Sequence, residues 1–367
     1  MMKNVKISSS QFLVLVTLFS VGTSVLIVPS ALAAKAKQDA WVVAIVSTVI
    51  GLFIIWLFCL LAQWFPQLTF VQMNEKILGK WLGKVASLLF VLMCLLYAST
   101  LLYYSATFLN THLMPNTPMA ALNILMVFVI VMGVRLGLET IARSAELLIF
   151  WFFFLFILLL IFITPEVKVE NIQPILESSP KTILQTSITL LEVTAINAIV
   201  LLMIFPAFIN NIKQAKKAFF IGNLLSGFII IILTFYCVSV LGVYSTESEL
   251  YPGYELAQRI NIGGFIQRIE AFMAAQWIIA LYFKTTLYFY GAVYGFAQIM
   301  NLKEYRSLTT PFGIIVVVLS LIIYPNVVYL QDWIATTGIL FSYSIGLFLP
   351  LLLIVVYVIR KKLMKQI

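Results

Sequence analysis

Long runs of apolar residues alternate with short polar segments along the whole chain. A transmembrane helix needs about 20 consecutive, mostly apolar residues. The spans that meet this length are residues 11–34, 41–64, 85–109, 119–137, 142–163, 183–208, 217–243, 268–299, 311–330 and 334–359. The pattern predicts an all-α, polytopic membrane protein whose ten helices form a single transmembrane domain over residues 1–367.

The first span is interrupted near its middle by residues that disfavour a helix. It contains Gly22, Thr23 and Ser24 and reaches Pro29. Glycine in a helix interior costs about 1 kcal/mol relative to alanine. An unwound turn at membrane depth persists only where it lines a cavity buried in protein. The alternative is that these small residues only let neighbouring helices pack closely.

The sixth span carries a second interruption. It contains Glu192, Thr194 and Asn197 among apolar residues and ends at Pro206. Interrupted spans at corresponding positions in two halves of a membrane protein point to a transporter's binding site. The pairing of the two interruptions favours broken helices over simple close packing.

Ten spans divide into two sets of five, so the second set enters the membrane from the opposite side. Spans one and six then cross in opposite directions, as a 5+5 inverted repeat requires. The first repeat is expected over about 11–163 and the second over about 183–330. The repeat is inferred from topology and the paired interruptions, because the two halves show no sequence identity.

The basic residues of the loops indicate the orientation. If both chain ends are cytoplasmic, most of the 23 lysines and arginines fall on the inner side, as the positive-inside rule expects. The net charge of +9 is therefore interpreted as a topology signal, and no nucleic-acid partner is expected.

Two connecting segments outside the spans carry further signals. In residues 69–84, apolar side chains recur at helical spacing at Phe70, Met73, Ile77 and Trp81, which predicts a short amphipathic helix on the inner surface. The outer loop 244–264 contains a stretch, 254–260, that is followed by two glycines. It is either a helix capping an outer vestibule or a solvated acidic loop.

Two ionisable residues lie deep within apolar spans. Glu192 is in span six, and Lys284 is in span eight, next to Thr285. Ionisable residues inside a membrane are costly and usually face a cavity. The two side chains either pair with each other or each serve a ligand or a proton route.

Polar groups near these charges complete the candidate site. Tyr97 belongs to a polar and aromatic stripe on span three, formed by Tyr97, Ser99, Thr100, Tyr103 and Tyr104. The stripe either lines a pocket or packs among aromatic side chains.

At the inner face, Glu139 and Arg143 are four residues apart and share a helix face, which favours an interfacial anchor over a gate.

These residues predict a binding site for a zwitterion. An unwound turn at Gly22, Thr23 and Ser24 offers free amides and the positive end of a half-helix to a carboxylate. Span six offers carbonyl groups and Asn197 to an amino group. Spans three and eight, with Tyr97, Lys284 and Thr285, bound the ligand's side chain, and Glu192 of span six either pairs with Lys284 or serves the ligand. The pattern suits an amino acid or a similarly small polar solute.

Composition excludes several other classes of protein. Hydrophobic residues make up 62% of the chain and charged residues only 10%, against about 25% charged in soluble domains. The cysteines Cys59, Cys94 and Cys237 lie in apolar spans and are expected to pack rather than to bind metal. The lone His112 argues against a histidine-based metal centre or catalytic triad. No cleavable signal peptide, cofactor or enzymatic activity is expected.

Several motifs together resemble the B-subunit family of spore germination receptors. They are GTS at 22–24, VPSAL at 28–32, GLETIAR at 137–143, LMIFP at 202–206 and FIQRIE at 265–270 with Trp277. The resemblance covers nearly the whole chain. It implies the broken-helix fold of the amino acid–polyamine–organocation permeases, the inner membrane of bacterial endospores, partner A and C subunits, and a nutrient such as an amino acid.

This chain departs from the family pattern at two places. Relatives often carry a glycine–acid pair where this chain has Ile196 and Asn197, and a small polar residue where it has Lys284. The chemistry of the ligand is therefore expected to differ. Two functions stay open: a nutrient-sensing receptor subunit, which the resemblance favours, and a secondary amino acid transporter. A membrane enzyme lacks any candidate group of residues.

Overall fold

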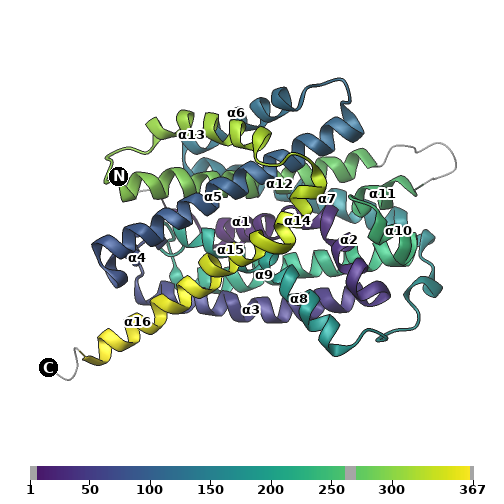
Figure 1. The fold of residues 1–367 in the computed structure, drawn as a ribbon, viewed down its shortest axis with the longest axis horizontal. Helices are drawn as coiled ribbons and strands as arrows, with labels where there is room; N and C mark the ends of the chain where they lie inside the picture. Colours follow the sequence, from purple (N-terminus) through teal and green to yellow (C-terminus); the bar gives the residue numbers. More distant parts are fainter. Residues whose placement is uncertain (1–5, 261–269, 364–367) are drawn as a thin grey trace.

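The computed structural model describes residues 6–260 and 270–363, and within them the expected all-α fold is confirmed. Long helices run side by side along the length of the molecule (Figure 1). In this part of the chain the one β pairing is an isolated bridge between Ile7 and Ile209. The family motif at 265–269 and the first residues of expected span eight lie outside the described residues.

The helices are these, in chain order: α1 (Ser9–Val21), α2 (Ser24–Ala36), η1 (Lys37–Asp39), α3 (Ala40–Trp64), α4 (Phe70–Leu78), α5 (Lys80–Phe108), η2 (Leu109–Leu113), α6 (Met119–Leu136), α7 (Leu138–Ile163), η3 (Thr164–Glu166), η4 (Val169–Ile172), α8 (Pro180–Thr194), η5 (Ile196–Met203), α9 (Ile212–Tyr236), η6 (Cys237–Leu241), α10 (Gly242–Ser248), α11 (Pro252–Gln258), α12 (Glu270–Ile299), α13 (Arg306–Ile322), α14 (Val327–Trp333), η7 (Ile334–Gly338), α15 (Ile339–Tyr343), η8 (Ser344–Phe348) and α16 (Leu349–Leu363).

Among the described residues, seven helical segments are long and apolar enough to cross a membrane. Two shorter apolar helices, α1 and α13, and the 30-residue α12 lie beside them. α1 is short because the expected first span is divided at Gly22 and Thr23. The chain is a multi-pass membrane protein, and the count of ten crossings stays a prediction.

The border between the expected ninth and tenth spans differs from the structure. Helix α13 ends at Ile322, and residues 327–330, expected in the ninth span, begin the last helix. Pro325 lacks the N–H that a continuing helix needs. The side chain of Asn326 then accepts a hydrogen bond from the N–H of Tyr329 at 2.8 Å, which caps the start of α14.

The expected amphipathic helix over 69–84 is divided at Gly79. α4 begins with a capping box formed by Thr69 and Gln72 and ends at Leu78. Its apolar side, with Phe70 and Ile77, is buried, and the helix packs against α5. Trp81 belongs instead to α5 and is 82% exposed, because Gly79 has a φ of 90° and turns the chain.

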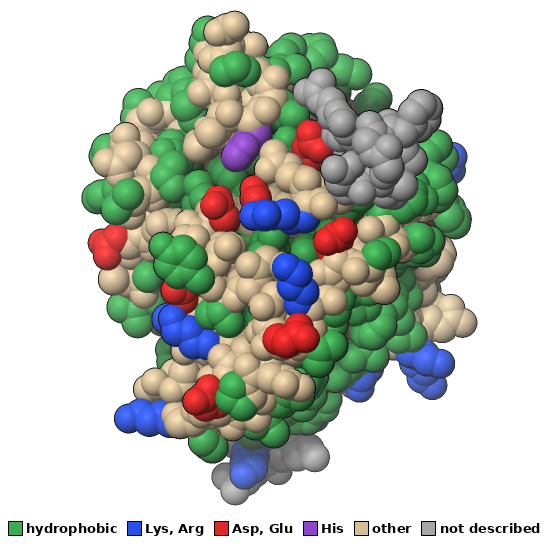
Figure 2. All heavy atoms as spheres, turned by 90° about the vertical axis from the view of Figure 1, so that its right-hand side faces the viewer, with side chains coloured by type: hydrophobic (Ala, Val, Ile, Leu, Met, Phe, Trp, Pro, Cys, Tyr) green, Lys and Arg blue, Asp and Glu red, His purple; other side chains and the backbone are tan. Residues whose placement is uncertain are grey.

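Residues 252–258 of the 244–264 loop form the helix α11, so the alternative of a solvated loop does not hold there. Tyr254, Leu256 and Ala257 on it are buried, and α11 packs against α2 and α12. Charged side chains of both signs gather on this end of the molecule, whereas its flanks are largely apolar (Figure 2). Flanks of this kind suit contact with lipid.

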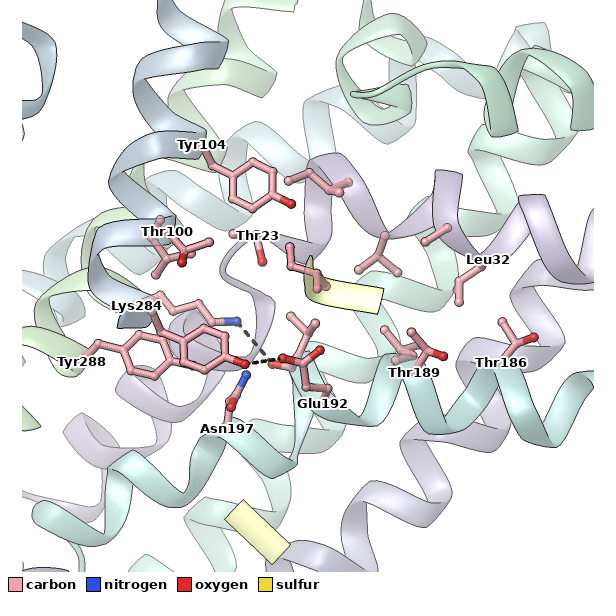
Figure 3. A pocket seen from close by; sticks show the side chains of 18 residues that line it. Thr23, Leu32, Thr100, Tyr104, Thr186, Thr189, Glu192, Asn197, Lys284 and Tyr288 are labelled. Atoms are coloured by element: carbon pink, nitrogen blue, oxygen red, sulfur yellow. Dashed lines mark hydrogen bonds between the residues drawn. The ribbon is translucent and has the colours of Figure 1, made fainter. Parts of the chain in front are cut away.

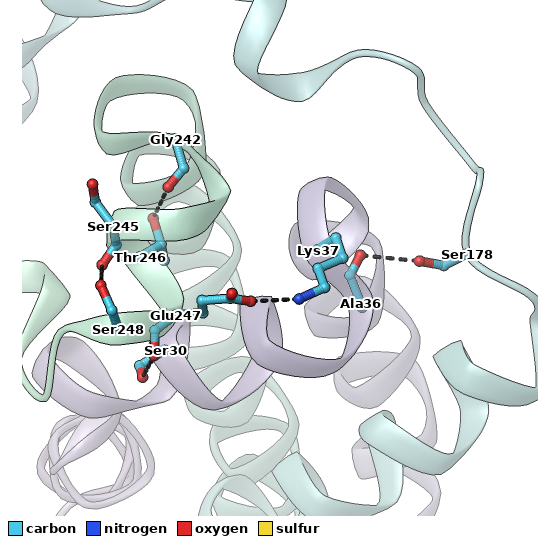
Figure 4. A network of polar contacts seen from close by, with 9 residues as sticks. All are labelled: Ser30, Ala36, Lys37, Ser178, Gly242, Ser245, Thr246, Glu247 and Ser248. Atoms are coloured by element: carbon cyan, nitrogen blue, oxygen red, sulfur yellow. Dashed lines mark hydrogen bonds and ion pairs between the residues drawn. The ribbon is translucent and has the colours of Figure 1, made fainter.

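Polar contacts tie the C-terminal end of α2 to α10 and to the segment before α8. Lys37 pairs with Glu247 of α10 at 2.6 Å, and the hydroxyl of Ser178 donates to the carbonyl of Ala36 at 3.0 Å (Figure 4). The fully buried carboxylate of Asp39 accepts hydrogen bonds from the backbone N–H groups of Leu176 and Ser178 at 2.7 and 2.8 Å. The C-terminal end of α2 and the segment before α8 are therefore joined.

The charged turn at the other end of the molecule is exposed. Arg143 pairs with Glu139 at 2.6 Å, and both side chains are largely in solvent. Exposed pairs of this kind contribute about 0–1 kcal/mol. This geometry is that of a surface pair on the first turns of α7.

Candidate functional site

The first helix break is made by Gly22. α1 ends at Val21, and Gly22 has a φ of 32° before α2 begins at Ser24. A β-carbon at this position would collide with the side chain of Lys284. Glycine is therefore required for two reasons: it adopts the positive φ, and it leaves room for the Lys284 side chain. The N-terminus of α2 presents backbone N–H groups that no preceding turn of helix can pair.

The second break takes a different form from the one expected. α8 ends at Thr194, and the chain continues as the 3₁₀ helix η5 (Ile196–Met203) rather than as an open turn. The carbonyl of Val193 accepts a hydrogen bond from the ammonium group of Lys284 at 3.2 Å. The carbonyl of Thr194 accepts one from the amide of Asn223 at 3.0 Å. Carbonyls left unpaired at a helix end thus find partners in side chains.

Glu192 is the acidic centre of the site and is 3% exposed. Its Oε1 atom accepts hydrogen bonds from the hydroxyls of Tyr97 at 2.8 Å and Ser342 at 2.9 Å. The two hydroxyls also contact each other. Ser342 Oγ lies 3.4 Å from Oδ1 of Asn197. Together these hydrogen bonds keep the buried Glu192 side chain in a fixed orientation.

Lys284 is the basic centre and is 2% exposed. It forms no ion pair with Glu192 within 4.0 Å; its ammonium group binds Val193 O and lies 5.4 Å from the centroid of the Phe19 ring. Its alkyl chain passes Gly22. One side chain of α12 therefore contacts both helix breaks, and a buried ammonium requires such partners.

A cavity of about 150 Å³ lies between the two breaks. Of the predicted site residues, Thr23, Tyr97, Glu192, Asn197 and Lys284 line it (Figure 3). The rest of its surface is mainly apolar and comes from α2, α5 and α8, together with Tyr288 and Ile334. Figure 3 shows Thr186, Thr189 and Glu192 in a row along α8, with Glu192 nearest Lys284.

Three predicted residues lie beside the cavity rather than in its lining. Gly22 forms the break itself. Ser24 is fully buried, and its hydroxyl has no hydrogen-bond partner. The hydroxyl of Thr285 donates to the carbonyl of Leu281 within α12 at 2.8 Å. The Thr285 hydroxyl is thus paired within its own helix.

Sequence reasoning missed Ser342 and Tyr288. The ring of Tyr288 stacks on Tyr97, with centroids 5.5 Å apart and an angle of 17° between planes. Ser342 lies on the last helix, far along the chain from its partners. One signal was available: Gly338, Ser342 and Gly346 are small residues spaced four apart, which is typical of a close helix contact.

The described residues contain no cluster of three or more His, Cys, Asp or Glu side chains that could hold a metal ion. The groups around the cavity are one carboxylate, one ammonium, amide and hydroxyl groups, and a helix N-terminus. This set is complementary to a small molecule that carries both an anionic and a cationic group.

Comparison with known sequences identifies relatives along the whole chain. The sequence model of a family described as "Spore germination protein" matches residues 6–328. "Spore germination protein KB" of Bacillus subtilis (strain 168) is 29% identical over 365 residues, covering 98% of this chain and 97% of the relative. "Spore germination protein YndE" of the same organism is 24% identical over 364 residues, covering 97% and 98%.

Solved structures share the fold at low sequence identity. MhsT in complex with L-phenylalanine superposes with a TM-score of 0.70 at 15% identity, covering 97% of this chain and 99% of that chain. A Na⁺-coupled sialic acid symporter, in a substrate-bound outward-open state, gives a TM-score of 0.65 at 16% identity, covering 92% and 75%. The fold is thus shared with proteins whose solved structures hold a bound amino acid or another substrate.

Proposed function

Because the chain belongs to the spore germination protein family, we propose that it is the permease-like subunit of a nutrient germinant receptor. In this role it binds a small nutrient, an amino acid, and triggers germination together with the receptor's A and C subunits. It lies in the inner membrane of the spore with both ends of the chain in the cytoplasm. The relatives that match the chain end to end support this assignment.

The observation that carries the proposal is the cavity between the two helix breaks, with buried charges of opposite sign at its edge. The N-terminus of α2 and the Lys284 ammonium receive the nutrient's carboxylate. Glu192 receives its ammonium group. The apolar wall, which includes Ile27, Ala31 and Leu190, contacts its side chain.

The size of the cavity limits the nutrient. An apolar cavity of about 150 Å³ is large enough for a molecule the size of benzene. A small or medium amino acid meets that limit. The family match and the cavity together favour a free amino acid over larger nutrients.

The test is a germination assay on spores that carry Gly22→Leu. The leucine strains the backbone at a φ of 32° and displaces Lys284, so the nutrient response should be lost while an immunoblot shows normal subunit levels. Gly79→Leu is the matched control, since Gly79 also has a positive φ, of 90°, but nothing lies within 4 Å of its β-carbon position. A normal response in Gly22→Leu spores would refute the proposal that this pocket binds the nutrient.

The alternative function is a secondary transporter of amino acids, which the fold shared with a Na⁺-coupled symporter favours. Uptake of labelled amino acids by proteoliposomes that contain this chain alone separates the two. Ion-driven accumulation would support the transporter. Binding without accumulation would support the receptor subunit.

A further inference from the structure

The last helix presents a row of small residues to the core. Gly338, Ser342, Gly346 and Pro350 are buried at intervals of four residues. An α-helix turns once in 3.6 residues, so each interval of four drifts by about 40°. Over three intervals a regular α-helix would carry Pro350 about 120° away from Gly338. Something in this helix must cancel the drift.

Two π-helical turns cancel it. Residues 334–338 and 344–348 form the π segments η7 and η8, one on each side of Ser342. A π turn contains more residues than an α turn, so each residue rotates less around the helix axis. Residues spaced four apart therefore stay on the same face of this helix. π turns are rare and occur often at functional sites. The last helix therefore adopts an unfavourable winding that keeps its small residues facing inward.

The inward row contacts the binding site at three points. The carbonyl oxygen of Gly338 lies 3.2 Å from the Tyr97 hydroxyl. Ser342 donates to Glu192. At Gly346 the helix approaches η5 so closely that a β-carbon would collide with Ile196. The last helix thus touches Glu192, its partner Tyr97, and the second break.

We propose that Ser342 is a positioning residue for the Glu192 carboxylate, and that the last helix rotates when a ligand's ammonium group engages that carboxylate. The inference rests on the proposed function, because the ligand is taken to be a nutrient with an ammonium group. The ammonium group competes with the Ser342 hydroxyl for the negative charge of Glu192. Without that hydrogen bond the π turns lose their support, and the helix rewinds toward regular α geometry.

The surroundings of the last helix suit such a movement. Leu340 and Phe348 on its outer side are 70% and 61% exposed, so rotation disturbs few protein contacts there. The same exposed side is where a membrane-embedded partner would sense the rotation. Occupancy of the cavity is thereby converted into a change on the surface of the subunit.

The experiment places a nitroxide on the last helix at Phe348→Cys in the purified chain in nanodiscs. The native cysteines are buried, so the introduced thiol is labelled selectively. Spectra are compared in backgrounds that carry Glu192→Gln or Ser342→Ala, with Ser342→Gly as a second variant should alanine impair folding. Thr189→Ala is the control background, since Thr189 lines the same cavity one turn from Glu192. A second label at Phe128→Cys on α6, which is 63% exposed, controls for global change.

Glu192→Gln and the Ser342 variants should each shift the Phe348 spectrum, and their combination should shift it no further. The Thr189→Ala background and the Phe128 label should show no shift. An unchanged Phe348 spectrum in the folded Glu192 and Ser342 variants would overturn the coupling, as would additive shifts. Titration with L-alanine and L-leucine then tests the ligand: a helix that responds to Glu192→Gln but to neither amino acid supports the coupling and counts against the amino acid site.

Discussion

Removal of the buried ammonium by Lys284→Met tests how the two charges depend on each other. The substitution removes a hydrogen bond from a charged donor to Val193 O, which is worth about 1.5–3 kcal/mol. It also removes the contact with the Phe19 ring, worth about 0.5–2 kcal/mol. Against these losses, the ammonium no longer has to be desolvated, which saves several kcal/mol.

The net change in stability depends on the Glu192 side chain that remains buried in the variant. Lys284→Met leaves Glu192 buried without its nearby positive charge, and breaking a buried charge arrangement on one side typically costs about 3–5 kcal/mol. Replacing both charges, with Lys284→Met and Glu192→Gln together, removes that penalty. Two charges 4 Å apart attract by about 4 kcal/mol at an effective dielectric constant of 20. This pair is farther apart, so we expect a coupling free energy of about 1–4 kcal/mol.

The assay measures thermal unfolding in detergent and uses size-exclusion chromatography to detect the folded protein. It compares wild type, the two single variants and the double variant. Both single variants should unfold at lower temperature, and the double variant should recover part of the loss. Lys217→Met, at an exposed lysine on α9, is the control and should match wild type. A Lys284→Met protein as stable as wild type, or strictly additive effects, would refute the electrostatic dependence. All three site variants should fail to respond to nutrient.

Two further predictions concern the supports of the site. Asn223→Ala leaves the buried carbonyl of Thr194 without its hydrogen bond and should cost about 1–3 kcal/mol, measured as a lower unfolding temperature; an unchanged value would mean that the second break needs no support from α9. Asp39→Ala leaves two backbone N–H groups unpaired and should cost about 2–6 kcal/mol, whereas Lys37→Ala removes a half-exposed ion pair and should cost under about 1 kcal/mol. Equal losses in these two variants would contradict the role given to Asp39.

The sequence was sufficient to predict the features that depend on local chemistry. The lengths of the apolar runs predicted the helices, and Gly22, Thr23 and Ser24 predicted the first break because these residues disfavour a helix interior. Deep polar residues predicted Tyr97, Glu192, Asn197 and Lys284 as neighbours, and all four line one cavity. Each of these expectations needed only the cost of a residue type in a membrane helix.

The features that depend on contacts between distant segments were not predictable. Lys284 binds a carbonyl of the second break rather than Glu192, and a carbonyl that is freed by a break does not show in the sequence. The 3₁₀ winding of η5 and the π turns around Ser342 follow from packing against neighbours. The predicted end of the ninth span was wrong. Apolar residues lie on both sides of Pro325, and hydropathy alone does not show that the helix ends before this proline.

The way the two half-helices are held indicates which part of the site moves. The C-terminal end of α2 and the segment before α8 are joined through Asp39 and Ser178, and Lys284 contacts both helix breaks. Two elements joined at both ends move as one body, so a change in the cavity must come from the helices that face them. Of the 18 most apolar consecutive residues in the segment 80–113, which contains α5, 67% are buried. In the last helix, 327–363, the corresponding share is 28%. The last helix has fewer contacts to lose, and it is therefore the element that a bound ligand displaces most readily.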